Sequence, residues 1–558
     1  MLSPSKTYKI WGKHSLLPAL LLFALFTACR PDGEDVAGLT VLRYNEDQNI
    51  TSLDPAFARN QANIWAVTQL FNGLVELDTA LEVRPAIAHS WNISEDGLKY
   101  TFYLHDDVFF HDNACFPGGK GRRVVAGDFV FSLSRLTDRS INSPGTWVMN
   151  QVARTGNDKL DIYAPNDTTL IIRLDAPFPA MLGLLTMQYC AVVPHEAITM
   201  YGRDFRRNPV GTGPFRFAYW KEGVKLVFRK NDHYFEFDGD KRLPYLDAVS
   251  ITFIKDRQTA FLEFVKGNLD LLTRVDASYQ DELLTPAGEL QPRYHDKLKM
   301  ITMPFLNSEY LGMLVSNDRV PTDWPLLDKR VRQAINYGFD RQKMITFLRN
   351  NIGTPAYGGF VPVGMPGFIR NEGGYSYNPD KARQLLAEAG YPGGIGLPAI
   401  RLSTNQAYQD IAQYIQFELG RIGINIEIDV MPPATLREMM ANAEAPFFRG
   451  SWIADYPDAE NYLALFYSPN KSPAGPNYTH FQDEAFDRLY EQALNQTNDS
   501  IRFALYHKMD SLIIDKAPKV FLYYDQSMRF VHHYVENMQN NALNHLVLKR
   551  VKINLQEE

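Results

Sequence analysis

The chain has 558 residues, with 57 Lys or Arg and 64 Asp or Glu, so its formal net charge is −7. This acidic balance lacks the positive surface that proteins use to bind nucleic-acid phosphates, and it argues against that class of partner. The 45% hydrophobic content is that of a globular protein, and the length exceeds what one core usually holds, so we expect several domains.

The first residues have the pattern of an export signal. Lys6, Lys9 and Lys13 precede an apolar run over residues 16–28. This run is shorter than the roughly 20 apolar residues that a membrane-spanning helix needs. A basic start followed by a short apolar run and small residues is typical of a secretory signal, so we predict a signal peptide over residues 1–28.

The cysteine that follows the apolar run indicates how the signal peptide is processed. Ala28 directly precedes Cys29 at the end of the apolar run, and residues 25–29 resemble a bacterial lipobox. In a lipobox the cysteine thiol is lipidated and the chain is cut just before it. The resemblance predicts a polar tether over residues 29–38 and a membrane-anchored protein outside the cytoplasm. The alternative is an ordinary signal-peptide residue that happens to be cysteine, and which membrane holds the anchor stays open.

Two further cysteines, Cys115 and Cys190, lie in the mature chain. In an oxidising compartment they could form one disulfide. Two cysteines far apart in sequence do not establish contact, and two small buried hydrophobic residues are the equal alternative.

Hydrophobic periodicity indicates strands and helices along the whole mature chain. Strands are predicted over residues 39–44, 98–110, 223–230, 246–255, 398–403 and 424–430, and helices over residues 63–71, 128–136, 257–266, 328–339, 379–389, 407–421 and most of 480–515. In the helix over 379–389, Asn378 is placed to cap the N-terminus. The strand–helix–strand order over 398–430 predicts a parallel sheet covered by helices. The fold class is therefore α/β, with more than one lobe.

Five segments carry a family resemblance. They are residues 88–104, 208–215, 328–341, 377–391 and 452–458. In this order they resemble the dipeptide/oligopeptide-binding family of ABC-transporter solute receptors, solute-binding protein family 5. The resemblance spans roughly residues 40–535, nearly all of the mature chain.

The resemblance implies a periplasmic-binding-protein-like fold of type II, cluster C. Two lobes joined by a hinge of two crossing strands close over a ligand, and an extra domain is inserted in the first lobe. Lobe one would take residues 39–84, 205–310 and 515–558, the inserted domain residues 85–204, and lobe two residues 311–514. The implied protein is a lipid-anchored monomer that captures a small ligand and delivers it to the permease of an ABC importer.

The resemblance also implies ligand-binding residues. Asp455 matches an acid that accepts the α-ammonium of the ligand in peptide-binding members, and Trp452 and Tyr456 beside it could wall the pocket. The alternatives are a turn aspartate and two core aromatic residues. A buried ammonium needs a charged partner, which is the physical reason for an acid at this place.

The remaining candidates lie in three other segments. Gln406 stands where dipeptide-binding members carry an arginine for the ligand carboxylate, which puts strict dipeptide recognition in doubt. A longer peptide, a ligand without a carboxylate, or compensation by another cation are the alternatives. The other candidates are Tyr408 in the same loop, Arg59 and Asn60 in an early loop, and Asn307 and Tyr310 near the second crossing. For Arg59 the alternative is a solvated loop residue.

Motifs of other chemistry are missing. His195-Glu196 has no second histidine four residues on, and no Gly-x-Ser-x-Gly elbow is present. We therefore expect no metal, no cofactor and no enzymatic activity. Peptides lead as ligands over oligosaccharides, opines, metal chelates and muropeptides. A ligand sensor uses the same binding chemistry and stays open, and a cell-wall lipoprotein hydrolase is the alternative from a different class.

Overall fold

A computed structural model gives the structure of this protein and describes residues 38–276, 279–316, 319–370 and 373–554. The chain divides into two units, Met1–Thr40 and Val41–Glu558. The predicted signal peptide, Cys29 and nearly all of the predicted tether lie outside the described residues. In the described ranges, no helix is both long enough and apolar enough to cross a membrane.

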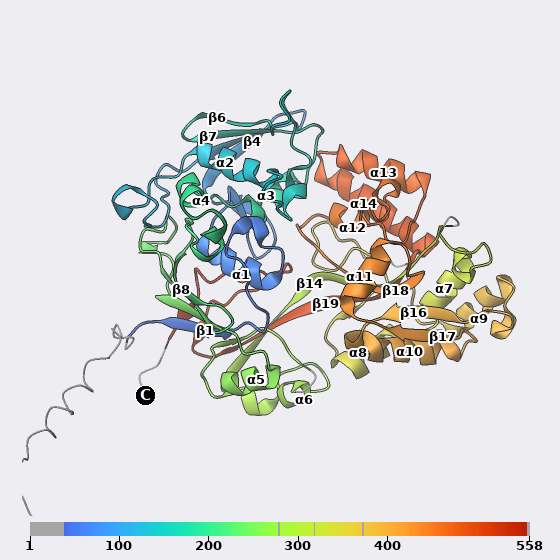
Figure 1. The fold of residues 1–558 in the computed structure, drawn as a ribbon. Helices are drawn as coiled ribbons and strands as arrows, with labels where there is room; N and C mark the ends of the chain where they lie inside the picture. Colours follow the sequence, from blue (N-terminus) through green and yellow to red (C-terminus); the bar gives the residue numbers. More distant parts are fainter. Residues whose placement is uncertain (1–37, 277–278, 317–318, 371–372, 555–558) are drawn as a thin grey trace, which may run out of the picture. The chain divides into compact units, whose positions relative to one another are not determined.

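An 11-stranded sheet organises the larger unit (Figure 1). Its order is β17-β16-β18-β14-β19-β13-β1-β12-β9-β8, and β15 pairs with β19 beside this path. The strands are β1 (Val41–Asn45), β8 (Phe215–Lys221), β9 (Lys225–Lys230), β12 (Ala248–Thr252), β13 (Leu271–Leu272), β14 (Leu298–Met313), β15 (Thr354–Pro355), β16 (Ile400–Thr404), β17 (Ile426–Val430), β18 (Phe447–Ile453) and β19 (Lys519–His532). The predicted strand–helix–strand unit is confirmed, because β16 and β17 pair in parallel.

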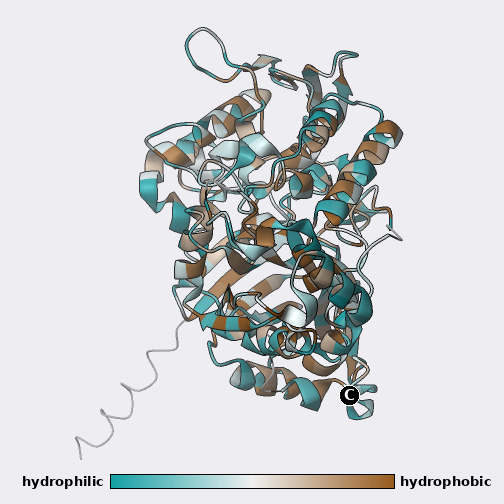
Figure 2. Ribbon diagram, turned by 90° about the vertical axis from the view of Figure 1, so that its right-hand side faces the viewer, coloured by the Kyte–Doolittle hydropathy of each residue, from teal (hydrophilic) through white to brown (hydrophobic). Residues whose placement is uncertain are grey.

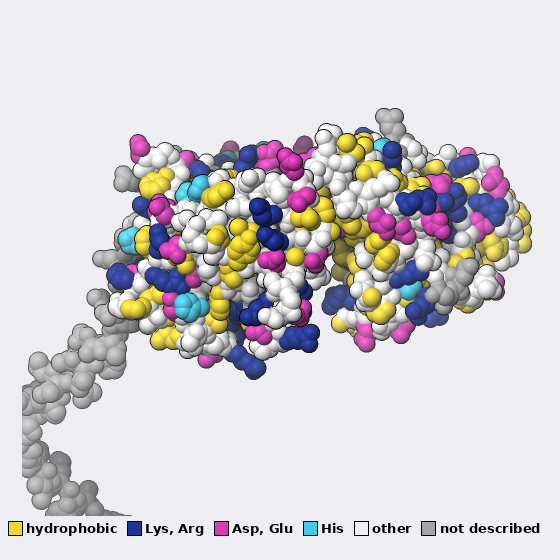
Figure 3. All heavy atoms as spheres, turned by 90° about the horizontal axis from the view of Figure 1, so that it is seen from above, with side chains coloured by type: hydrophobic (Ala, Val, Ile, Leu, Met, Phe, Trp, Pro, Cys, Tyr) yellow, Lys and Arg dark blue, Asp and Glu magenta, His cyan; other side chains and the backbone are white. Residues whose placement is uncertain are grey.

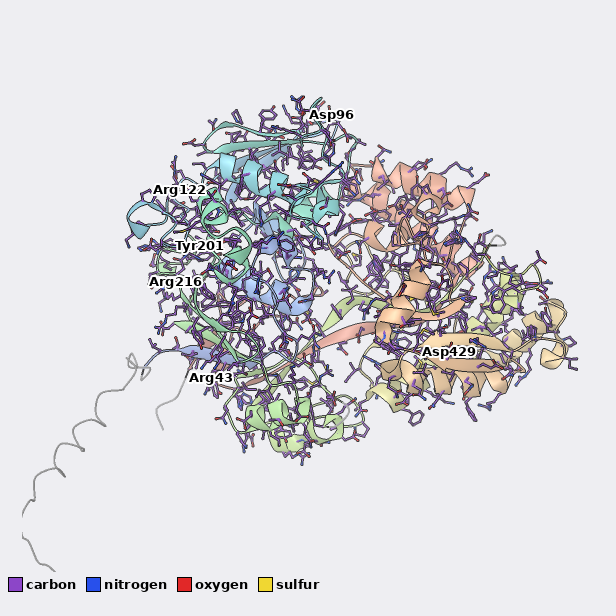
Figure 4. All side chains as sticks on the ribbon, in the orientation of Figure 1. Arg43, Asp96, Arg122, Tyr201, Arg216 and Asp429 are labelled. Atoms are coloured by element: carbon purple, nitrogen blue, oxygen red, sulfur yellow. The ribbon has the colours of Figure 1, made fainter. Side chains whose placement is uncertain are left out.

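Two long strands, β14 and β19, join the two halves of this sheet. Their antiparallel register runs from Leu298 opposite His532 to Gly312 opposite Lys519, with a shift between Pro304 and Ser308. On one side of the shift lie β1, β8, β9, β12 and β13, which we call the first lobe. On the other side lie β15 to β18, the second lobe. Figure 4 labels Arg43 on β1 and Asp429 on β17, one on each side of the crossing strands.

A separate four-stranded sheet has the order β4-β5-β7-β6. Its strands are β4 (Ala88–Ile93), β5 (Lys99–Leu104), β6 (Ile162–Asn166) and β7 (Thr169–Arg173), and α2 (Ala126–Leu136), α3 (Met181–Leu185) and α4 (His195–Tyr201) accompany them. In β5 the alternation predicted from the sequence is confirmed, because Tyr100, Phe102 and Leu104 are buried while Tyr103 is exposed. This sheet shares one hydrophobic cluster with the first lobe, since Phe102 and Leu42 belong to the same core.

Helices flank the main sheet on both sides of the crossing. They are α1 (Gln61–Leu70), α5 (Arg257–Val265), α6 (Gln280–Leu283), α7 (Lys329–Tyr337), α8 (Arg341–Arg349), α9 (Pro379–Glu388), α10 (Gln409–Gly420), α11 (Pro433–Ala441), α12 (Glu460–Leu463), α13 (Glu484–Leu494) and α14 (Asp499–Lys516). Asn378 caps α9 as predicted, since its Oδ1 accepts from the N–H of Lys381 at 2.9 Å. The predicted helical stretch over 480–515 is two helices, because Asn498 caps a new one.

Short hairpins complete the fold. They are β2 (Val75–Leu77) with β3 (Val83–Pro85), β10 (Phe237–Asp238) with β11 (Lys241–Arg242), and β20 (Val535–Glu536) with β21 (Lys552–Ile553). Brown, hydrophobic residues alternate with teal, hydrophilic ones along both the helices and the strands in Figure 2. Two further core clusters contain Phe360 and Ile400 respectively, and the first of them also includes Leu81 and Ala542.

Cys115 and Cys190 are both free thiols. They therefore do not form the disulfide that was one of the two alternatives. Cys190 is fully buried, and burial raises the pKa of its thiol to about 12. A thiol of this kind stays protonated and unreactive, so Cys190 serves packing.

The second lobe contains a buried amine in an aromatic cage. Lys519 is 2% exposed, and its Nζ lies 3.9 Å from the ring centroid of Tyr310 and 3.8 Å from that of Phe360. Among the described residues this Nζ has no hydrogen-bond partner, and burial lowers the pKa of the amine well below its usual value. Contact with the aromatic rings stabilises a protonated amine. This stabilisation is smaller than the free-energy cost of removing an unpaired charge from water.

We therefore predict that Lys519→Met stabilises the fold at pH 7, by about 1–3 kcal/mol. The lowered pKa means that the unfolded chain binds a proton that the folded chain does not. Wild-type stability thus rises as pH increases toward the unfolded pKa of about 10.5, and the advantage of the variant shrinks. Thermal unfolding at pH 7 and pH 9.5 measures both effects. A variant that unfolds at lower temperature than the wild type at both pH values would contradict this reading.

Candidate ligand-binding site

The segment after β18 presents an acidic side chain to solvent. Trp452 lies near the end of β18, α12 begins at Glu460, and Asp455 lies in the turn between them. The Asp455 side chain is solvent-accessible, yet the surrounding protein desolvates it and raises the pKa of its carboxyl. No lysine or arginine in the described ranges forms an ion pair with Asp455, so its charge is not neutralised.

Asn461 holds Asp455 and Trp452 in place together. Its Oδ1 accepts a hydrogen bond from Nε1 of Trp452 at 2.8 Å and from the N–H of Asp455 at 3.4 Å, and its Nδ2 lies 3.4 Å from Oδ2 of Asp455. The two predicted residues therefore share one amide, which orients both side chains.

Tyr456 is fixed by a buried carboxylate beneath the turn. The hydroxyls of Tyr456 and Tyr490 both donate to Glu460, and Tyr456 is only 5% exposed. Next to it, Tyr506 donates to Oδ1 of Asp458 at 2.7 Å. This network gives the turn that carries Asp455 a rigid base.

The turn faces the four-stranded-sheet region. The ring centroid of Tyr456 lies 6.4 Å from that of Trp147, and a Cβ placed on Gly183 would lie 3.6 Å from that of Tyr456. Burial raises the pKa of Tyr189 to about 12, with Asp455 acting in the same direction and Arg59 opposing it. Asp455 and Arg59 therefore both contribute to the electrostatic environment of the Tyr189 hydroxyl.

The two predicted residues of the early loop have different surroundings. Asn60 is the N-cap of α1, and its Oδ1 accepts from the N–H of Asn63 at 2.9 Å, so its side chain is engaged in the fold. Arg59 is exposed, and no ion pair to it is found in the described part of the chain.

At the crossing, Asn307 and Tyr408 join a network of charged groups. Nδ2 of Asn307 donates to Glu309 at 2.9 Å, and the hydroxyl of Tyr408 donates to Glu309 at 3.4 Å. Arg449 pairs with Glu309 and lies over the Tyr408 ring, 3.2 Å from its centroid. Burial raises the pKa of Glu309, and Arg449 opposes that shift.

The network extends to a second ion pair on the same crossing. Nδ2 of Asn307 also lies 3.3 Å from Asp525, which accepts from Arg349 at 2.8 Å. Two acids and two arginines thus balance each other. The sequence analysis missed all four; charged residues inside otherwise apolar strands, such as Glu309 in β14, were the available signal.

Two more candidates lie apart from Asp455. Gln406 is exposed, and its Nε2 donates to Gln409 at 2.8 Å. Tyr310 is 1% exposed in the core of the second lobe, against Phe360 and Lys519, which favours packing over contact with a ligand.

The wider surface adds little to this site. The face in Figure 3 carries basic and acidic side chains interspersed. A hollow of about 690 Å³ lined by His111 and Arg216 contains none of the predicted residues. Lys120 on its rim is already paired with Asp112 at 2.7 Å.

Nowhere in the described ranges do three His, Cys, Asp or Glu side chains group as a metal would require.

Comparison with known proteins identifies relatives that align with most of the chain. The dipeptide-binding protein DppE of Bacillus subtilis is 26% identical and aligns over 97% of this chain and 98% of its own. The heme-binding protein A of Haemophilus influenzae is 28% identical over 81% of this chain and 80% of its own. The likeness therefore extends to receptors named for different ligands.

Solved structures share the fold. The periplasmic binding protein DppA of Helicobacter pylori, in complex with the peptide STSA, superposes with a TM-score of 0.73 at 25% identity, covering 92% of this chain and 98% of its own. HbpA2 of Haemophilus parasuis gives a TM-score of 0.79 at 22% identity, covering 92% and 100%. These structures confirm the predicted type II periplasmic-binding-protein fold.

The family model described as bacterial extracellular solute-binding proteins, family 5 Middle, matches residues 82–474, about 70% of the chain. With the crossing strands and the paired lobes already described, this match means that the chain belongs to the family 5 bacterial extracellular solute-binding proteins.

Proposed function

We propose that this chain is a receptor that captures a small solute, a peptide in the first place, between its lobes and delivers it to an ABC importer. The observation that carries the proposal is the carboxylate of Asp455, which is solvent-accessible and has no ion-pair partner among the described residues. Relatives support the transport role, since the Helicobacter pylori protein is named as associated with an ABC transporter.

Asp455 suits an ammonium group of the ligand. The surrounding protein strips water from the carboxylate, which strengthens its attraction for a cation. A primary ammonium donates charge-assisted hydrogen bonds, which are about twice as strong as neutral ones. Trp452 flanks this acid, is partly exposed and would contact the first residues of a peptide, whereas the burial of Tyr456 favours the alternative of a core aromatic residue.

Capture would proceed by a population shift. A ligand that touches both lobes stabilises the closed arrangement, and the strands β14 and β19 supply the hinge. We propose residues 85–204 as the inserted domain, because the four-stranded sheet and α2 to α4 all fall inside that range. We place the division between the lobes at the register shift after Pro304, so Tyr310 and Lys519 fall in the second lobe and not in the first, where the sequence boundaries put them. No step in this account requires bond breaking.

We further propose that the receptor is exported and anchored by a lipid on Cys29. The support is the lipobox-like segment at residues 25–29 and the extracellular setting that the family description gives. An anchored receptor stays close to its permease, which raises the effective concentration of the captured solute there.

Replacing Asp455 by Asn should weaken binding of a free-amine peptide by about 2–5 kcal/mol and leave its N-acetylated form almost unaffected. The peptide is chosen after native mass spectrometry of receptor purified without refolding. Isothermal titration calorimetry then measures both affinities. Asp429→Asn, on β17, removes the same charge elsewhere and should bind like the wild type. Equal losses for the amine and its acetylated form would reject the ammonium assignment.

Binding of the same peptide should depend on pH through Asp455. The raised pKa means that the carboxyl takes up a proton at a higher pH than an ordinary aspartate. Affinity should therefore fall about tenfold per pH unit below that pKa, and stay level above it until the amine itself deprotonates. The Asp455→Asn variant should show a flat profile at acidic pH. A wild-type profile as flat as that of the variant would contradict the proposal.

Cys29→Ala should abolish lipid attachment. In bacteria fed with radiolabelled palmitate, the wild-type chain should carry label and fractionate with membranes, whereas the variant should carry none. Cys115→Ala serves as the matched control and should remain labelled. Equal labelling of the Cys29→Ala variant would place the lipid elsewhere.

A further inference from the structure

The C-terminal segment between β20 and β21 contacts both lobes beside the crossing strands. We call residues 537–549 of this segment the strap. Met538 and Leu546 belong to the core cluster of the first lobe. Ala542, which lies between them in the sequence, belongs instead to the cluster that contains Phe360 of the second lobe. The strap is therefore a third connection between the lobes, in addition to β14 and β19.

The strap is tied to the first lobe at Asn544. Nε1 of Trp65 on α1 donates to the carbonyl oxygen of Asn544 at 2.9 Å. The buried guanidinium of Arg529 on β19 donates to the same carbonyl oxygen at 3.2 Å and to Oδ1 of Asn544 at 3.1 Å. Arg529 stands opposite Ile301 in the ladder, on the first-lobe side of the register shift. Both donors therefore belong to the first lobe.

Two residues earlier, the strap is tied to the second lobe at Ala542. The N–H of Leu306, which lies beyond Pro304 on β14, donates to the carbonyl oxygen of Ala542 at 2.7 Å. A Cβ placed on Gly364, in the loop after β15, would lie 3.5 Å from the Cβ of Ala542. Ala542 is thus held by the backbone of β14 and packs against a loop of the second lobe.

A tight turn joins these two anchors, with only Leu543 between them. The N–H of Asn544 donates to the carbonyl oxygen of Asn541 at 2.8 Å, and the φ angle of Asn544 is 56°, in the left-handed region. Two residues span at most about 7 Å even when fully extended, so the connection has little slack. Rotation of the lobes about the register shift must therefore break an anchor or unfold the turn.

Both anchors are formed while the inserted domain touches the second lobe. A Cβ placed on Gly97, in the turn between β4 and β5, would lie 3.5 Å from Cγ2 of Thr497, between α13 and α14. The ring of Tyr456 also lies near that of Trp147, with 6.4 Å between their centroids. The described arrangement, with the strap intact, is therefore one in which the two sides of the cleft are in contact.

We propose that the strap limits the opening of the lobes, so that the empty receptor favours the closed arrangement and binds its solute more tightly. This inference rests on the proposed receptor function. It assigns control of affinity to a segment that contains none of the predicted ligand-binding residues. The apparent affinity of a receptor falls with the fraction of molecules in the arrangement that binds, so a looser strap weakens binding without changing any ligand contact.

The test lengthens the strap without removing a side chain. Gly-Ser-Gly is inserted between Leu543 and Asn544 of the full mature chain, and the same insertion after Gly239, in the exposed turn between β10 and β11, is the control. Small-angle X-ray scattering of stripped receptor should give a larger radius of gyration for the strap insertion than for wild type and control. The co-purified solute should bind it at least threefold more weakly by calorimetry, and at saturation all three radii should agree.

Asn544→Gly is a milder second variant, and it decides the test if the strap insertion does not fold. Glycine adopts the left-handed backbone of this position readily, and the substitution removes only the Oδ1 that accepts from Arg529. It should change the radius and the affinity in the same directions, by smaller amounts. Strap variants with the radius and affinity of the control would overturn the inference.

Failure of the proposed function has a different signature. If solute leaves the scattering of the wild type unchanged, capture by closure is wrong, and the inference about the strap falls with it. If the wild type closes on its solute while the strap variants match the control, the receptor function stands and only the role of the strap is rejected.

Discussion

The pairing of β14 with β19 is the constraint on which the rest of this structure depends. These two strands connect the first lobe to the second, and their ladder shifts register just after Pro304. Proline has no N–H to donate, so the ladder loses a bond at that point. Leu306 donates its N–H to the carbonyl oxygen of Ala542 instead, at 2.7 Å. This break, which is followed by a second register shift between Glu309 and Tyr310, is a suitable place for two lobes to turn on each other.

Charges near the crossing fall into two kinds. Glu309, Arg449, Arg349 and Asp525 neutralise each other within hydrogen-bonding distance, as buried charges must if they are not to destabilise the fold. Asp455 and Arg59 have no such partners among the described residues, although the protein around Asp455 desolvates it. The paired charges are therefore satisfied within the protein, and we propose that the unpaired carboxylate of Asp455 remains for a solute.

Local signals in the sequence predicted much of the fold. The alternation in residues 98–104, the capping Asn378 and the strand–helix–strand order over 398–430 each depend on neighbours in the chain, and each is found in the structure. The crossing itself depends on partners more than 200 residues apart, such as Leu298 and His532, so periodicity could not reveal it. The family resemblance supplied that topology.

The candidate site was harder to predict for the same reason. A motif placed Asp455 in the chain, but the ion pair between Glu309 and Arg449 joins β14 to β18 and leaves no short-range pattern. Asn60 resembled a cleft residue, yet its side chain caps α1, a role that needs only the helix start beside it. The sequence could not distinguish an asparagine that contacts a ligand from one that caps a helix, because both roles place an asparagine side chain in a loop.

Small-angle X-ray scattering of the mature receptor tests most directly whether capture between moving lobes is the function. The radius of gyration should fall when the co-purified solute is added back to stripped protein, and that solute should be recovered chemically unchanged. A bound solute that leaves the scattering curve unaltered, or that is released as new products, would contradict the account.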